Sequence, residues 1–519
     1  MEIMDAHKEY SKMCTDRQTY LDMGYEAAEL TIPFLLPRNN IKGQVLSKAY
    51  QSLGSRLVNT LSSKLLLSQF PPNSPFFKYQ IDDFTLEKLK RDRGLVEEAL
   101  SSMERAVTQE VDSKAMRIPL FETLRHLIVT GNMVVNLTPE NTLRVFHLDQ
   151  YVIKRDPEGL PIKALVQEIM SHEVYKEIFG STPPQSNNNS ENTKEDAELN
   201  LYTTILYDGS TNKYTVKQSV NGKSVGKPST YPKDKLPWMF LRFNSIDGED
   251  YGRGLVEENI GDLRAFNGLS KNILDAAAAS SKVVFLISPN STLTATKLAS
   301  VENLGFLSGV REEVQALQVD KFNDLNMASQ LAKNIEGRLA AAFLLNQSVQ
   351  RQAERVTAEE IRFLANELES SLGGIYSLLS HELQLPLVVG IIANLERAKK
   401  LPEMPRDTVK PVIITGFEAL GRSNDSQKIL TMAKELMAAF GPEAIASQFI
   451  MGETIKRVGS GMSIDMKGLI KTPEQLQEEQ EAAQQQNVQM EAMKALGPNA
   501  VNQVGALQQQ NQAKQPLQE

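Results

Sequence analysis

The sequence predicts an α+β protein that is mostly helical, and three observations support this class. Apolar residues recur at helical spacing in long stretches, for example at Leu53, Leu57, Leu61 and Leu65. Residues 131–245 instead alternate with a period of two, which is typical of strands. Proline and glycine separate these stretches, so the chain is expected to form several elements around more than one core.

The N-terminal part is expected to be helical. One helix fills about the first 30 residues and ends near Pro33. A second helix is predicted from about Gly43 to Phe70. Helical spacing resumes from Leu86 to about Val129, with an interruption near Pro119, and it ends at Gly131-Asn132.

The β-rich region is expected to contain short strands joined by tight turns. Asp156-Pro157-Glu158-Gly159 has the composition of a type I turn, and Asp208-Gly209 marks the turn of a hairpin. Pro183 to Glu198 is polar and is predicted to be a loop. The expected strands are Met133–Leu137, Leu143–Leu148, Tyr151–Lys154, Ile162–Val166, Leu201–Tyr207 and Lys213–Val220.

Two long helices are predicted next, one from Leu255 to Lys282 and one from about Phe322 to Leu345. An insert separates them, and it begins with an apolar strand at Val283–Ile287. The first helix ends in small residues that would let another helix approach closely, although plain helix propensity explains them equally well. The residues of these helices that are expected to pack between subunits are Ala276, Ala277, Ala278, Ala279, Leu331, Ile335 and Leu339.

The following segment, Asn346 to Val356, has no apolar periodicity. Thr357-Ala-Glu-Glu360 is a capping box that predicts a new helix. Gly373 and Gly374 are expected to bend that helix, and Pro386 to break or kink it. Further helices are predicted from Asp425 to Phe440 and from about Glu443 to Val458. The last residues, 471–519, are rich in glutamine and are expected to be partly disordered.

Composition limits the possible partners. The 519-residue chain has 56 Lys and Arg against 64 Asp and Glu, a net charge of −8, which argues against a broad basic surface that grips nucleic acid. Its one cysteine, Cys14, excludes an internal disulfide framework and fits a reducing compartment. Met1–Tyr10 is not a secretory signal, and Leu385–Ala393 is shorter than the about 18 residues of a membrane span. A soluble protein made inside a cell, without a membrane partner, is expected.

No catalytic, metal or cofactor site is predicted. The five histidines have no ligand spacing, and no nucleophile elbow is present. Gly222-Lys223-Ser224 lacks the first glycine of a phosphate loop and is interpreted as a charged hairpin turn. Tyr251-Gly-Arg-Gly254 is interpreted as a flexible hinge. The acid pairs Glu257-Glu258 and Glu359-Glu360 are assigned to helix first turns, so we expect a structural protein and not an enzyme.

Six segments carry a family resemblance that covers about residues 15 to 425. The most specific is the run Gln350-Arg-Gln-Ala-Glu-Arg-Val-Thr-Ala-Glu-Glu-Ile-Arg362 within Leu339–Leu387. The others are Gly54–Lys64, Asp247–Arg253, Gly261–Arg264, Ser280–Val283 and Thr415–Arg422. In these segments the chain resembles the portal proteins, or head-to-tail connectors, of short-tailed bacteriophages.

The resemblance implies a ring, expected to be a homododecamer, at one vertex of the capsid. Double-stranded DNA would pass through it during packaging and ejection, and the ring would nucleate head assembly. The implied regions are a wing (1–253 and 357–400, β-rich at 131–245), two stem helices (254–282 and 321–345), a clip (283–320), a tunnel loop (346–356), a crown (401–470) and a glutamine-rich barrel or tail (471–519).

The resemblance also implies which residues face DNA. A charge that faces the channel is repeated in every subunit and becomes a belt. We expect Arg351 and Arg355 to form a positive collar, partly offset by Glu354, or alternatively to pair with carboxylates of a neighbouring subunit. The expected channel residues are Asn346, Gln347, Ser348, Gln350, Arg351 and Arg355.

Several partners follow from the resemblance. These are the major capsid protein, scaffolding and internal core proteins, transiently the terminase large subunit, and later tail adaptor or nozzle proteins. The protein is expected in the virion after assembly in the bacterial cytoplasm. Two other functions are kept as alternatives: another phage structural protein such as a coat or tail tube, and, against the missing phosphate loop, a DNA-handling ATPase.

Overall fold

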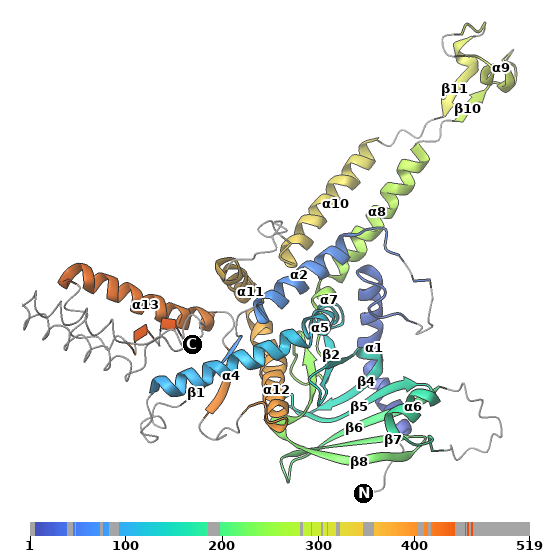
Figure 1. Cartoon of the computed structure of the whole chain (residues 1–519). Helices are drawn as coiled ribbons and strands as arrows, with labels where there is room; N and C mark the ends of the chain where they lie inside the picture. Colours follow the sequence, from blue (N-terminus) through green and yellow to red (C-terminus); the bar gives the residue numbers. More distant parts are fainter. Residues whose placement is uncertain are drawn as a thin grey trace, which may run out of the picture. The chain divides into compact units, whose positions relative to one another are not determined.

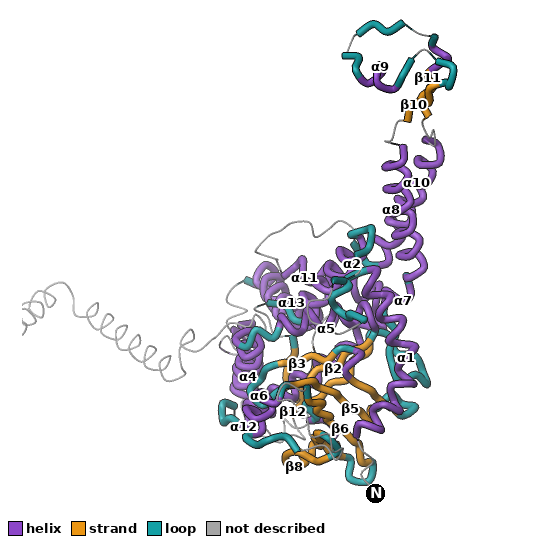
Figure 2. Tube along the Cα trace, turned by 90° about the vertical axis from the view of Figure 1, so that its right-hand side faces the viewer, coloured by secondary structure: helices purple, strands orange, loops and turns teal. Residues whose placement is uncertain are grey.

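The computed structural model confirms the predicted fold class, since the described residues form long helices together with small antiparallel sheets (Figures 1 and 2). It describes residues 6–38, 45–46, 48–72, 76–81, 93–184, 198–280, 284–291, 293–302, 305–308, 310–317, 322–345, 358–401, 409–413 and 417–441, with 452, 454–455 and 458–459. The chain forms two compact units. The first is Met1–Arg91 with Ala99–Gly421, and the second is Asp92–Glu98 with Arg422–Glu519.

The described elements are labelled as in Figure 1. The helices are α1 (Ala6–Leu30), α2 (Leu53–Gln69), α4 (Arg93–Ser113), α5 (Arg117–Thr130), α6 (His172–Phe179), α7 (Leu255–Glu258), α8 (Ile260–Ser280), α9 (Ala295–Ala299), α10 (Phe322–Ala342), α11 (Ala358–Leu379), α12 (Leu385–Arg397) and α13 (Phe417–Phe440). The strands are β1 (Phe77–Ile81), β2 (Asn132–Leu137), β3 (Leu143–Phe146), β4 (Tyr151–Arg155), β5 (Pro161–Met170), β6 (Leu199–Asp208), β7 (Lys213–Val220), β8 (Lys223–Pro232), β9 (Trp238–Arg242), β10 (Val284–Ile287), β11 (Val314–Leu317) and β12 (Val409–Ile413). Short 3₁₀ turns occur at Leu148–Gln150, Lys233–Lys235 and Arg311–Glu313, and η4 (Ser380–Gln384) is a π-helical turn.

Helix α2 begins at Leu53 and not near Gly43 as predicted. A tertiary contact sets this start. The Gln51 amide donates to the Leu30 carbonyl oxygen at 2.7 Å and accepts from the Gly54 N–H at 2.7 Å. Gly54 lies so close to α1 that an added Cβ would stand 3.2 Å from the Thr31 Cα atom. The end of α1 therefore fixes the first turn of α2, which apolar spacing does not reveal.

The break between α4 and α5 lies at Ala115, which has a φ of 50°, and not at Pro119. Pro119 is in the first turn of α5, where its missing N–H removes no helical hydrogen bond. The predicted end at Gly131 is confirmed, because Gly131 has a φ of 74° and its N–H donates to the Leu127 carbonyl oxygen at 2.9 Å.

The β-rich region forms two antiparallel sheets. One has the strand order β3-β2-β9 and the other β4-β5-β6-β7-β8. All the strands predicted in this region are confirmed within a few residues of their ends. The pairing of β2 with β9, which places Asn132 opposite Arg242, was not predicted, since more than a hundred residues separate the two. The predicted loop 183–198 lies outside the described residues over 185–197.

Helix α1 packs on the five-stranded sheet. Tyr10 and Met13 share a buried cluster with Val152, Leu165 and Tyr202. Figure 2 shows α1 running beside this sheet.

An arginine of α1 holds the same contact. Arg17 is 6% exposed, and it donates to the carbonyl oxygens of Leu148, Asp149 and Tyr151 at 3.1, 2.7 and 2.9 Å. The guanidinium satisfies carbonyls where the chain leaves one sheet for the other, and so joins α1 to both sheets.

The C-terminal part of the first unit extends beyond the expected wing. Strand β12 pairs antiparallel with β1, with Val409 opposite Ile81. The compact unit thus continues to Gly421, whereas the expected crown begins at 401. Helix α13 ends at Phe440 as predicted but begins at Phe417, so its first residues belong to the first unit and the rest to the second. The predicted helix 443–458 lies mostly, and the glutamine-rich tail wholly, outside the described residues.

Candidate assembly and DNA-channel site

Helices α8 and α10 are the predicted pair of long helices, and they lie side by side in both views (Figures 1 and 2). The first predicted helix is divided, because Asn259 separates α7 from α8. Arg338 of α10 pairs with Asp262 of α8 at 2.7 Å. These two helices therefore pack against each other within one chain.

The stem residues predicted to pack between subunits divide into two groups. Ile335 and Leu339 are only 3% and 0% exposed within the single chain. Their assignment to subunit packing is corrected, because they already pack inside the protomer. Leu331 is 49% exposed, and three alanines, Ala277–Ala279, are also exposed, whereas Ala276 is partly buried.

The same two helices expose further large apolar side chains. Leu274 of α8 is 57% exposed and Met327 of α10 is 76% exposed. These two residues, with the exposed Leu331, Ala277, Ala278 and Ala279, are called here the stem surface. Large apolar side chains that stay exposed on two paired helices are available for contact with another chain.

The insert between α8 and α10 contains a two-stranded sheet. β10 and β11 pair antiparallel, with Ile287 opposite Val314, and the Ser291 hydroxyl donates to Glu313 at 2.6 Å. Its described side chains include exposed Phe285 (63%) and Phe306 (102%). A strand pair this small buries little apolar surface by itself.

Tyr251-Gly-Arg-Gly254 forms a packed joint and not the predicted flexible hinge. Tyr251 is 2% exposed, and its hydroxyl accepts from the Ile153 N–H at 3.2 Å. The Arg253 guanidinium pairs with Glu249 at 2.8 Å and with Glu257 at 2.6 Å, and it lies 4.6 Å from the centre of the Tyr20 ring. These carboxylates raise the pKa of Arg253.

The glycines of this joint serve close backbone packing. A Cβ added to Gly252 would stand 2.8 Å from the Gly131 carbonyl oxygen, and one added to Gly254 would stand 2.8 Å from that of Ile128. The buried Asn132 amide donates to the Gly252 carbonyl oxygen at 2.7 Å and accepts from the Gly252 N–H at 2.7 Å. Backbone atoms touch here without room for side chains, so the start of α7 is fixed to α5 and β2.

The long helix that begins at Ala358 is bent at two places. Leu372 leaves helical geometry, with a φ of −120°, directly before Gly373 and Gly374. The second irregularity is η4, the π-helical turn before Pro386. Pro386 does not break the helix. The π turn loosens the hydrogen bonding just ahead of a residue that has no N–H, and Pro386 stands in the first turn of α12.

The π turn presents Glu382 to the three-stranded sheet. Glu382 accepts from the guanidinium of Arg242 at 2.6 Å and from its backbone N–H at 2.9 Å, and the two side chains are only 10% and 13% exposed. Arg155 lies beside this pair and donates to the carbonyl oxygen of Phe240 at 3.0 Å. Burial lowers the pKa of Arg155 to about 10.

Ser370–Arg397 is the one helical run of the described residues with the length and hydropathy of a membrane span. One side of this run packs in the core of the folded chain. Leu379, Leu383, Leu387 and Ile391 are 0% exposed in the folded chain.

The predicted channel residues Asn346, Gln347, Ser348, Gln350, Arg351 and Arg355 lie outside the described residues, as does Thr357 of the capping box. The described chain stops at Leu345 and resumes at Ala358, where α11 begins. The structure thus gives both ends of this segment.

Other candidates for chemistry take structural roles. Gly222, with a φ of 75°, and Asn221, with a φ of 50°, form the β7–β8 hairpin turn, as predicted. Glu258 accepts from the Asn244 side chain at 3.3 Å. Over the described ranges, no three His, Cys, Asp or Glu side chains come together as metal ligands do.

One histidine has a strongly shifted pKa. His126 is 1% exposed, and its ring stacks on that of His147 at 5.8 Å. Burial, with smaller contributions from His147 and Arg125, lowers the pKa of His126 to about 3.

Comparison with known families decides the identity. The family model described as bacteriophage head to tail connecting protein matches residues 4–470. The chain belongs to this family. It therefore has the portal function in the phage capsid, and it is a structural component at the junction of head and tail.

Relatives of known function agree over most of the chain. The portal protein of Escherichia phage T7 is 34% identical over 93% of this chain and 91% of its own length. That of Enterobacteria phage T3 is 35% identical over 91% and 89%, and that of Pseudomonas phage phiKMV is 30% identical over 90% and 92%. Among solved structures, the neck of an empty gene transfer agent particle matches at a TM-score of 0.37 and 10% identity, covering 73% of this chain and 86% of that chain.

Sequence reasoning missed several residues that position these elements. The Arg242–Glu382 pair links residues 140 positions apart, and Lys64 is a buried lysine inside a leucine-rich helix face. Only Lys64 has a local signal, since it stands on the apolar side of α2 beside Leu61 and Leu65.

Proposed function

We propose that this protein forms the portal ring, a homododecamer at one capsid vertex, through which double-stranded DNA is packaged and ejected. The observation that carries the proposal is the match to the head-to-tail connecting family over residues 4–470. The ring nucleates head assembly in the bacterial cytoplasm and remains in the virion.

The regions of the chain take the roles that the family resemblance implies. Residues 1–253 and 357–400 form the wing, α8 and α10 the stem, and 283–320 the clip. Residues 346–356 form the tunnel loop, 401–470 the crown and 471–519 the barrel or tail. Two observations support the stem and clip assignments: α8 and α10 pack side by side, and a small strand pair connects them.

Subunits meet at the stem surface. Its alanines allow close approach of a neighbouring helix, while Leu274, Met327 and Leu331 would lose exposed apolar area on contact. Such a contact joins two different faces of neighbouring subunits. It gives a closed ring only when the rotation from one subunit to the next is a whole fraction of a full turn. The two open edges of the β10–β11 sheet would extend by pairing with a neighbour's strand.

The clip also docks the changing partners outside the capsid. The terminase large subunit binds there during packaging, and tail adaptor or nozzle proteins replace it afterwards. Exposed Phe285 and Phe306 supply apolar contact area for these proteins. The wing binds the major capsid protein, and the interior face meets scaffolding and core proteins.

The tunnel loop carries the contact with DNA. Arg351 and Arg355 form a positive collar in an otherwise acidic ring, which holds or gates the DNA without the many cationic contacts of ordinary DNA binders. Pairing of both arginines with carboxylates of a neighbouring subunit remains the alternative. Arg351→Ala with Arg355→Ala is expected to impair packaging or genome retention in a complementation assay, and unchanged values would exclude the collar.

The protein acts without chemistry of its own. The hairpin position of Gly222-Lys223-Ser224 supports this, because a phosphate loop must connect a strand to a helix. The purified ring is expected to show no ATP hydrolysis above buffer, and turnover abolished by Lys223→Ala would contradict this part of the proposal.

The ring itself is tested by native mass spectrometry of the purified full-length chain, together with electron microscopy of intact particles. We expect one dominant oligomer, a twelve-membered closed ring, and density for it at a single vertex. Tubes, shells or a monomer at high concentration would favour another structural role.

A further inference from the structure

Lys64 is a lysine inside the protein core. Its side chain is 5% exposed on α2, between Leu61 and Leu65, which are both fully buried. A buried ammonium loses its hydration, so it is tolerated only where acceptors replace the water. The positions of those acceptors therefore indicate what this lysine does.

The first acceptor is the end of α10. The Lys64 ammonium donates to the Leu344 carbonyl oxygen at 2.7 Å. Leu344 has a φ of 53°, and the N–H groups of Leu344 and Leu345 donate to the carbonyls of Ala341 and Ala340 at 3.1 and 2.7 Å. This is a Schellman ending with leucine at the position where glycine is usual. A cation there compensates the negative end of the helix dipole.

The second acceptor lies on α11. The Glu367 Oε2 atom stands 3.5 Å from the Lys64 ammonium, and the Glu367 side chain is 25% exposed. Further along, the Tyr376 hydroxyl donates to the Ser68 carbonyl oxygen at 3.3 Å, and the Gln384 amide donates to that of Gln69 at 2.6 Å. Helix α2 is thus attached along the length of the bent helix, and Lys64 is the attachment that also includes α10.

We propose that Lys64 is a positioning residue that ties the C-terminal end of α10 to α11. The tie sets the separation of the two ends between which residues 346–357 run. Only the consequence for DNA passage rests on the proposed function, whereas the tie rests on the described contacts. Without the ammonium, the strained end at Leu344 loses the group that holds it.

Hydrogen exchange of the assembled full-length protein tests the tie. In Lys64→Met, peptides covering residues 340–345 are expected to exchange about tenfold faster or more, because a hydrogen bond to a charged group is lost. Peptides of α2 itself should change less. Lys64→Arg keeps the charge and should restore most of the protection, which a purely space-filling role would not predict.

Lys333→Met is the matched control, since Lys333 is an exposed lysine on α10. It should leave exchange at 340–345 unchanged. Equal acceleration in both variants, or none in Lys64→Met, would overturn the proposal. If Lys64→Met does not fold, Glu367→Gln is tested in its place. Faster exchange near residues 367–372, with the end of α10 still protected, would support the tie. Unchanged exchange near residues 367–372 would refute it.

A complementation assay for packaged genomes separates the tie from its use. Faster exchange together with fewer DNA-filled particles supports both the tie and its role in DNA passage. Faster exchange with normal packaging and genome retention rejects the role in DNA passage while the tie stands. Loss of the ring in wild-type protein would instead reject the proposed function.

Discussion

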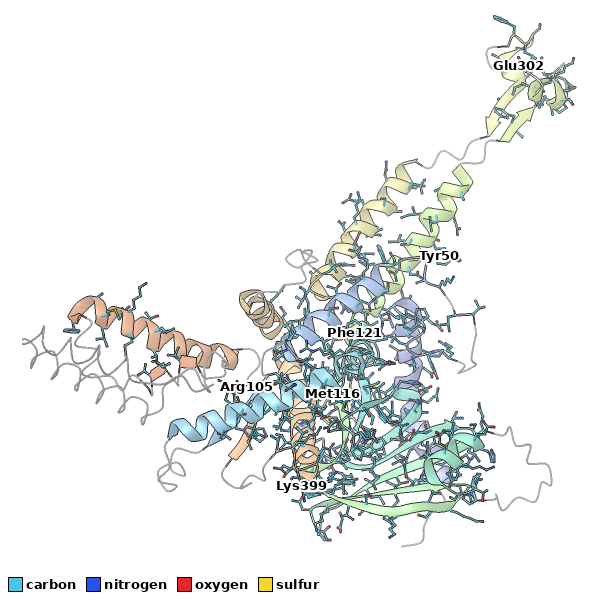
Figure 3. All side chains as sticks on the ribbon, in the orientation of Figure 1. Tyr50, Arg105, Met116, Phe121, Glu302 and Lys399 are labelled. Atoms are coloured by element: carbon cyan, nitrogen blue, oxygen red, sulfur yellow. The ribbon has the colours of Figure 1, made fainter. Side chains whose placement is uncertain are left out.

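At the scale of single residues, two described helices besides α4, which is followed by Ala115, end on a side chain in the left-handed region. Leu344 follows α10 and Lys399 follows α12, with φ values of 53° and 56°. Leucine and lysine both carry a Cβ that makes this conformation unfavourable. Leu344 has Lys64 as a partner, whereas Lys399 is exposed at the end of α12 (Figure 3).

Lys399→Gly is therefore expected to stabilise the protein. The N–H groups of Lys399 and Lys400 donate to the carbonyls of Glu396 and Leu395, both at 3.0 Å, and glycine keeps these bonds without the Cβ penalty. The free energy of unfolding in urea should rise by about 1 kcal/mol. Lys399→Ala removes the same charge but keeps the Cβ, so it should give no such gain.

Protonation of His126 is expected to destabilise the fold in acid. Its pKa is lowered to about 3 in the folded protein against about 6.5 when unfolded, so between these values the unfolded chain binds more protons. The contribution of neutral His126 to the free energy of unfolding is fully present above pH 6.5. Below pH 6.5 this contribution falls by up to about 1.4 kcal/mol per pH unit. His126→Phe, which keeps a ring against His147, should flatten that part of the curve in urea titrations from pH 7 to 4. An unchanged slope would show that other groups cause it.

At the scale of elements, backbone packing replaces flexibility where α7 begins. Glycines before a helix suggested a hinge because glycine has the widest conformational freedom. In the structure these glycines serve close packing of the backbone and do not form a hinge. Gly252 and Gly254 allow the chain to touch residues 128–131, and the Arg253 pairs fix it further.

Gly252→Ala is expected to cost about 1–3 kcal/mol of unfolding free energy, because its Cβ would stand 2.8 Å from a backbone oxygen that cannot easily move. Gly268→Ala in α8 is the control. A Cβ there meets nothing within 4 Å, and alanine favours the helix, so stability should rise by about 0.5–1 kcal/mol. Similar effects of both changes in thermal unfolding would mean that the joint is loose.

At the scale of the whole molecule, the exposed stem surface is expected to control ring formation. Met327→Glu with Leu331→Glu places two charges where apolar area would be buried between subunits, and should shift native mass spectra from rings to monomers. Circular dichroism should stay unchanged, since both side chains are exposed in the chain. Ile178→Glu on α6 is the matched control, because Ile178 is 61% exposed there. Rings that persist in the double variant would place the interface elsewhere.

The sequence by itself determined the local structure of this protein. The strands of residues 131–245, the turn at Gly222, the end at Gly131 and the paired long helices all depend on spacing and turn chemistry within a few residues. Family membership was also accessible, because it is carried by short runs such as Gln350–Arg362.

The tertiary structure decided what depends on distant groups. The start of α2 is set by Leu30, the rigidity of Tyr251–Gly254 by residues 128–132, and the π turn at Glu382 by Arg242. Ile335 and Leu339 were predicted to face a neighbour, but apolar spacing identifies a buried side without saying which chain buries it. Packing between segments far apart in the chain therefore decided which glycines are held in place, which helices bend and which apolar residues stay exposed.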